Sequence, residues 1–187
     1  MTAIAGYTDG KTWAIAADSG IFEGGNFDGD EGSGIYWTSP VPKIWRVENS
    51  LVGVAGDAAI GDLVQTCASG DPHKLASFLR ESVKNGSEIY GKDWNVLVVT
   101  KKAVFYLDDL FAVSSFTRGY MTVGAAGSVA LGALAVSAEM KQAPRDAVRL
   151  AIKVAIANHM FAVGPVKYKV LGEEKDLTPV SKSDKVV

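Results

Sequence analysis

The sequence is short of the residues on which several common classes of protein depend. Its 187 residues include one cysteine, two histidines and six prolines, and the formal net charge is −2. The single thiol, Cys67, excludes an internal disulfide, so we expect a reducing cytoplasm as the compartment. No basic face is evident, and we expect no nucleic-acid partner.

No segment has the basic-then-apolar pattern of a signal peptide. The most apolar run covers residues 123–140, but it is rich in alanine and glycine and is interrupted by serine. This composition favours a tightly packed buried helix over a membrane span, so no membrane association is expected.

A Ser-His-Asp catalytic site and a nucleotide-binding motif also lack support in the sequence. The histidines are His73 and His159, and no G-x-S-x-G sequence is present, so a Ser-His-Asp site has little support. There is no P-loop, and any use of ATP would therefore belong to a separate partner.

The glycine-rich, acidic segment 22–34 is expected to be an exposed loop. Asn26, Asp28 and Asp30 alternate in it as in a calcium-binding loop. Glu31 stands where that loop requires glycine, and Trp37 occupies its last position, so we reject an EF-hand and expect no metal and no cofactor. The loop could instead cover a substrate channel or touch a neighbouring subunit.

The order of predicted elements is strands, two helices, strands, two helices and a strand. It predicts one domain over 1–187 with a polar tail at about 172–187, and an α+β fold in which two antiparallel sheets lie face to face with a helix pair outside each. The last helix is apolar nearly all round and is expected to be sandwiched. Strands are expected at 2–7, 11–17, 35–38, 43–47, 51–55, 94–100, 103–107 and 166–171, with further extended chain up to 123, and helices at about 57–68, 71–84, 128–141 and 145–160.

Each of four residues has an ordinary structural interpretation on its own, but together the four could form a catalytic site. Thr2 is a small residue after Met1, Asp18 a carboxylate at a turn, Lys43 a lysine and Gly56 a tight turn before a helix. If Met1 is removed, the Thr2 hydroxyl can attack a carbonyl while its own amine accepts the proton. A nearby Lys43 ammonium would lower the pKa of that amine, Asp18 would orient Lys43, and the Gly56 N–H could stabilise an oxyanion.

With these residues in view, the chain resembles the proteasome β-subunit family of N-terminal threonine (Ntn) hydrolases, including HslV and related short phage-encoded proteins. The matching segments cover residues 2–6, 16–19, 41–44, 51–59, 123–124 and 164–165. The resemblance extends over about residues 2–171. The matching segments indicate this family when taken together, although no single one of them would.

The resemblance implies a four-layer αββα sandwich, threonine endopeptidase activity on peptide or unfolded-protein substrates, and assembly into a homo-oligomeric ring. By matching position, Thr2 is the nucleophile, Asp18 and Lys43 are its charged partners, and Gly56 is the oxyanion donor. Val54 and Ala58 would line an apolar pocket for the residue before the cut.

Three positions depart from the family pattern. Ala125 replaces a serine near the nucleophile's amine, with Ser128 three residues later, and Met160 and Val163 stand in the stretch where an aspartate and a serine are usual. Asn158 or His159 could substitute, although His159 is better explained as a partly buried helix residue. Two alternatives therefore stay open: an inactive ring-forming scaffold of the same fold, and an Ntn amidohydrolase acting on a small amide.

Overall fold

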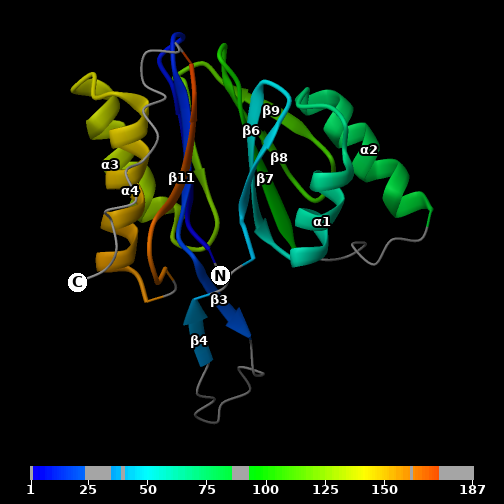
Figure 1. The fold of residues 1–187 in the computed structure, drawn as a ribbon, viewed down its shortest axis with the longest axis horizontal. Helices are drawn as coiled ribbons and strands as arrows, with labels where there is room; N and C mark the ends of the chain where they lie inside the picture. The colour runs from blue at the N-terminus through cyan, green and yellow to red at the C-terminus, as the bar shows by residue number, and fades with distance from the viewer. Residues whose placement is uncertain (1, 24–34, 39–40, 86–92, 161, 173–187) are drawn as a thin grey trace, which may run out of the picture.

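Two antiparallel sheets form the centre of the computed structural model, which describes residues 2–23, 35–38, 41–85, 93–160 and 162–172 (Figure 1). The first sheet has the strand order β10-β1-β2-β11 and the second has the order β5-β6-β7-β8-β9. The first comprises β1 (Ile4–Thr8), β2 (Trp13–Ala17), β10 (Tyr120–Val123) and β11 (Lys167–Leu171). The second comprises β5 (Ile44–Val47), β6 (Ser50–Gly56), β7 (Trp94–Val99), β8 (Val104–Leu107) and β9 (Val113–Phe116).

A helix pair covers the outer face of each sheet (Figure 1). Helices α1 (Ala58–Thr66) and α2 (Pro72–Lys84) cover the second sheet. Helices α3 (Gly127–Glu139) and α4 (Pro144–Asn158) cover the first. The four-layer α+β sandwich expected from the sequence is thus confirmed.

Three apolar clusters fill the spaces between these layers. One lies between α3, α4 and the first sheet, one between the two sheets, and one between the second sheet and α1 and α2. All five residues of β1 are buried, because both faces of this strand are covered. That double burial explains why the sequence of β1 does not alternate between apolar and polar residues.

Local signals set the helix boundaries on the second sheet's side. The Asp57 carboxylate accepts the N–H of Ala59 at 2.8 Å, so Asp57 is the N-cap of α1 rather than its first residue. Asp71 accepts the N–H of His73 at 2.9 Å and caps α2 with Pro72 in its first turn, as predicted. Helix α2 ends at Lys84, as predicted.

The two helices over the first sheet are less enclosed than expected. Met140, just after α3, is 68% exposed and Leu150 of α4 is 41% exposed, so no further layer of described residues lies outside either helix. Helix α4 packs on β1 and β2 and alongside α3 with one face only, which corrects the expectation of a sandwiched helix. The sequence of α4 is apolar nearly all round, and that of α3 is rich in small residues, so composition alone suggested that both helices are buried.

The chain after β2 also differs from expectation. Residues 22 and 23 belong to β3 (Gly20–Glu23), which pairs with β4 (Ile35–Thr38), instead of starting a loop. The two-stranded ribbon extends from one end of the sandwich (Figure 1). The rest of the predicted loop and the polar tail after residue 172 lie outside the described residues. No helix among those described is long and apolar enough to cross a membrane.

Candidate active site

Asp18 follows the last residue of β2 and is held against the start of the chain. The pairing of Ile4 with Ala17 brings the two strand ends together. The Ala3 N–H donates to Asp18 Oδ1 at 2.9 Å, and the Asp18 N–H donates to the Ala3 carbonyl at 3.1 Å. These bonds hold the carboxylate beside the residue that follows Thr2.

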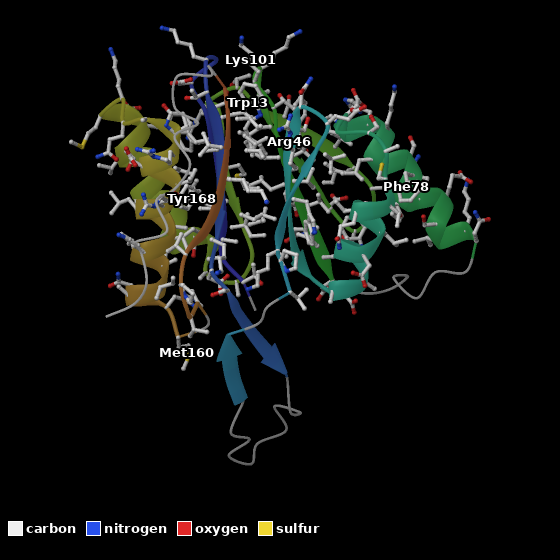
Figure 2. The ribbon with its side chains drawn as sticks, in the orientation of Figure 1. Trp13, Arg46, Phe78, Lys101, Met160 and Tyr168 are labelled. Carbon is white, nitrogen blue, oxygen red and sulfur yellow. The ribbon has the colours of Figure 1, made fainter. Side chains whose placement is uncertain are left out.

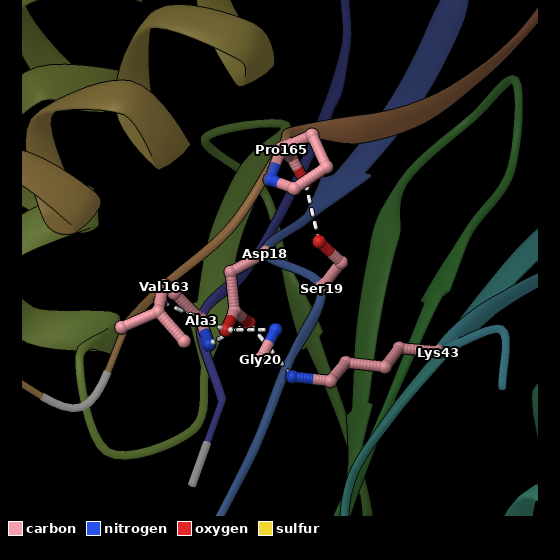
Figure 3. A network of polar contacts seen from close by, with 7 residues as sticks. All are labelled: Ala3, Asp18, Ser19, Gly20, Lys43, Val163 and Pro165. Carbon is pink, nitrogen blue, oxygen red and sulfur yellow. Dashed lines mark hydrogen bonds and ion pairs between the residues drawn. The ribbon is translucent and has the colours of Figure 1, made fainter. Parts of the chain in front are cut away.

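Lys43 approaches the same carboxylate oxygen from the second sheet. Its Nζ lies 3.0 Å from Asp18 Oδ1, and the side chains of the lysine and the aspartate are 11% and 0% exposed (Figure 3). The backbone around Lys43 is fixed because its carbonyl accepts the N–H of Val54 at 2.9 Å. Burial lowers the pKa of Lys43, and the neighbouring Asp18 opposes that change without cancelling it.

The second carboxylate oxygen binds backbone groups. Asp18 Oδ2 accepts the N–H of Gly20 at 3.1 Å and that of Val163 at 3.4 Å (Figure 3). With the Ala3 N–H and Lys43, four donors compensate for the burial of this charge. Asp18 and Lys43 therefore form a buried ion pair whose carboxylate is held by backbone groups from three segments of the chain.

Ser19 ties the segment before β11 to the end of β2. Its N–H donates to the Val163 carbonyl at 3.2 Å, and its hydroxyl donates to the Pro165 carbonyl at 2.9 Å (Figure 3). Ser19 is only 5% exposed. The segment that lacks the family's aspartate and serine therefore still contacts Asp18, through its backbone.

Thr2 is 7% exposed and its backbone is held from the other side by the turn before α3. The Ala126 N–H donates to the Thr2 carbonyl at 3.3 Å. Gly124 has a φ of 92°, and a Cβ at this position would collide with the Thr2 carbonyl oxygen. Thr2 thus lies between this turn and the Asp18 network, next to Ala3.

The other predicted site residues lie around the end of β6. Gly56 is exposed, has a φ of 112° and pairs with Trp94 just before the N-cap of α1. Ala58 is exposed in the first turn of α1, whereas Val54 is buried in the apolar cluster beneath α1 and α2. The hydrogen bond from Val54 to the carbonyl of Lys43 connects this strand with the charged pair.

At the positions that depart from the family pattern, no side chain takes the place of the usual aspartate beside Asp18. Ala125 is exposed, between the two residues that contact Thr2, and Met160 is 73% exposed. Asn158 is exposed, and its amide donates to the Val154 carbonyl of its own helix at 2.8 Å. His159 is half-buried at the end of α4, in agreement with its interpretation as a partly buried residue.

Sequence reasoning missed the backbone donors to Asp18 and the contacts of Ser19. The Ala3 contact could have been inferred from the hairpin register, since Asp9-Gly10 fixes which residues of β1 and β2 pair. The contacts with Val163 and Pro165 could not, because they join residues about 145 positions apart.

Comparison with known proteins supports the fold. No protein-family model matches the chain, and no curated protein matches it significantly. Among solved structures, Thiobacillus denitrificans BPH in complex with epoxomicin has a TM-score of 0.72 at 19% identity, covering 91% of this chain and 98% of that one. Another structure of Thiobacillus denitrificans BPH has a TM-score of 0.72 at 20% identity, covering 94% and 100%. Eukaryotic HslV from Trypanosoma brucei has a TM-score of 0.70 at 18% identity, covering 92% and 100%. The proteasome-like fold implied by the sequence is therefore confirmed.

Proposed function

We propose that this chain, after removal of Met1, is an N-terminal threonine endopeptidase. The observation that carries the proposal is the sharing of Asp18 Oδ1 between Lys43 Nζ and the N–H of Ala3, directly after Thr2. A buried ion pair beside the first residue of a mature chain is suited to tuning an amine and a hydroxyl on the same residue. The similarity in fold to BPH and HslV agrees with this interpretation.

The proposed reaction has two steps. The Thr2 hydroxyl oxygen adds to the carbonyl carbon of the scissile amide, and its proton passes to the neutral Thr2 amine, directly or through a water. The intermediate releases the leaving amine, which takes that proton, and an ester to Thr2 remains. Water then hydrolyses the ester, releases the new carboxyl end and restores the hydroxyl.

The charged pair would keep Thr2 reactive near neutral pH. The Lys43 ammonium disfavours a second positive charge on the Thr2 amine and so lowers the pKa of that amine. Asp18 keeps Lys43 charged despite its burial. The Gly56 N–H would donate a hydrogen bond to the developing oxyanion, and Val54 and Ala58 would contact the residue before the cut.

Intact-mass spectrometry with an epoxyketone tests this proposal, because that group reacts with both the amine and the hydroxyl of an N-terminal threonine. We expect loss of Met1 and one adduct that maps to Thr2, and no adduct in a Thr2→Ala variant. Mature protein that is never modified and cleaves no peptide would contradict the proposal. Cleavage of small amides without cleavage of peptides would instead indicate an amidohydrolase.

A second candidate function is a non-catalytic scaffold of the same fold. Ala125 and the exposed Met160 favour it, because neither position supplies the polar group usual in the family. Under this alternative, Thr2→Ala leaves the biological role intact and the mature protein gives no adduct.

We propose in addition that the chain forms a homo-oligomeric ring. Val136 and Met140, on and just after α3, are 60% and 68% exposed, and large exposed apolar side chains near one another are typical of interaction surfaces. Native mass spectrometry would show a closed oligomer of defined size, and a Val136→Glu/Met140→Glu variant would dissociate if this surface is the contact. A separate ATPase would be a partner of that ring.

A further inference from the structure

A cavity of about 310 Å³ adjoins the charged pair on the side of β11. One wall is the segment that leads into β5, with Val41, Pro42 and Lys43, and the other is the beginning of β11. Strand β11 is at one edge of the first sheet and β5 at one edge of the second. The cavity therefore lies between the edges of the two sheets.

Two lysines of β11 face this cavity because of the alternation of side chains along a strand. Tyr168 lies on the helix side of the sheet (Figure 2). The Arg149 guanidinium of α4 is 4.8 Å from the centre of its ring. Lys167 and Lys169, one residue to either side, belong to the opposite face. Leu171, the next residue on that face, packs into the apolar cluster between the sheets. The inner face of β11 thus changes from apolar to cationic where it reaches the cavity.

The charges around the cavity are unbalanced. Asp18 is the one carboxylate among its lining residues, and it is already paired with Lys43. Neither Lys167 nor Lys169 has an ion pair within the described part of the chain. Among the described residues, the cavity therefore carries two positive charges without a counter-charge, beside the Asp18–Lys43 pair.

We propose that this cavity binds the carboxylate of a peptide. Lys167 and Lys169 supply the positive charge, and Val41 and Pro42 supply an apolar wall for a neighbouring side chain. The outer edge of β11 offers backbone groups to an extended chain, because β2 is its one strand partner among the described strands. The proposal does not depend on the peptidase activity of Thr2.

Lys167 and Lys169 are exposed, and lysines on an edge strand can also serve simply to prevent strand pairing between molecules. That role requires no ligand, so a binding measurement separates the two explanations. Isothermal titration calorimetry at low salt on the full-length Thr2→Ala protein makes the measurement without cleavage of the peptide.

Three peptide probes show whether the cavity binds a C-terminal carboxylate or the carboxylate of an acidic side chain. These are N-acetyl-trialanine as the free acid, the same peptide as its C-terminal amide, and an amidated peptide that contains one aspartate. We expect saturable binding of the free acid and at least tenfold weaker binding of the trialanine amide. Binding of the aspartate peptide would also support the proposal and would assign the site to acidic side chains as well.

A matched pair of variants locates the site. Lys167→Gln/Lys169→Gln is expected to weaken binding of the free acid at least tenfold, whereas Lys102→Gln/Lys153→Gln, which removes the same charge from exposed positions elsewhere, leaves it unchanged. Circular dichroism checks that both variants are folded. Absence of saturable binding, equal binding by both double variants, or binding of inorganic phosphate alone would overturn the proposal.

Discussion

The N–H of Ala3 and the carboxylate of Asp18 form a buried hydrogen bond of 2.9 Å. The same oxygen of Asp18 binds Lys43 at 3.0 Å, so one atom connects the start of β1 with the beginning of the second sheet. A disturbance of Asp18 is therefore expected to affect both the stability of the fold and the surroundings of Thr2.

Asp18→Asn should destabilise the protein strongly. The substitution leaves the Lys43 ammonium buried without its counter-charge, and loss of one partner of a buried pair costs about 3–5 kcal/mol. Urea unfolding of this variant and of Asp146→Asn provides the test, because Asp146 pairs with Arg145 at the surface, where such a pair contributes less than about 1 kcal/mol. Equal losses in the two variants would contradict a structural role for the buried pair.

The reaction of Thr2 with an epoxyketone should have a bell-shaped pH dependence. The rate rises with pH as the Thr2 amine loses its proton, and falls as Lys43 loses its own. Burial lowers the pKa of Lys43, so the falling limb should begin below the ordinary pH range of lysine. Between the lowered pKa of Lys43 in the folded protein and its ordinary pKa in the unfolded chain, the unfolded chain binds more protons. The contribution of Lys43 to the free energy of unfolding therefore increases with pH in this range.

Lys43→Arg isolates the falling limb, because a guanidinium stays protonated over the whole accessible pH range. If the variant folds and reacts, the rate should reach a plateau at high pH instead of falling. An unchanged falling limb in Lys43→Arg would show that another group controls it. Lys84→Arg, at an exposed ion pair on α2, is the control and should keep the bell shape.

The sequence predicted the layers and the charged pair better than it predicted the surroundings of Asp18. Local signals were sufficient for the elements: Asp71-Pro72 begins α2, and the alternation of strands and helix pairs indicates the sandwich. The backbone donors of Gly20 and Val163, by contrast, depend on how the end of β2 meets the chain before β11. Backbone groups are the same in every residue, so residue types alone cannot reveal such contacts. The exposed outer faces of α3 and α4 were missed because apolar composition does not show whether a further layer covers a helix.

Gly124→Ala should destabilise the fold and displace Thr2. Its φ of 92° is unfavourable for alanine, and the added Cβ would meet the Thr2 carbonyl, so we expect a loss above about 1 kcal/mol. Gly132→Ala is the matched control, since nothing lies within 4 Å of a Cβ at that position in α3 and alanine there should gain about 0.8–1.0 kcal/mol. Thermal unfolding measures both effects. Similar melting temperatures for the two variants would contradict the close approach of Gly124 to Thr2.

Ala125→Ser should increase the reaction rate of Thr2. Ala125 is exposed and lies between Gly124 and Ala126, both of which contact the Thr2 backbone, so a hydroxyl there can be added without disturbing the core. One additional hydrogen bond made in the transition state, worth about 1.4 kcal/mol, corresponds to a tenfold faster reaction. The second-order rate constant for epoxyketone modification, followed by intact mass, is the measurement. Ser128→Ala should leave that rate unchanged, because Ser128 is exposed in the first turn of α3. If Ala125→Ser is folded and no faster than the parent protein, the missing serine does not limit the reactivity of Thr2.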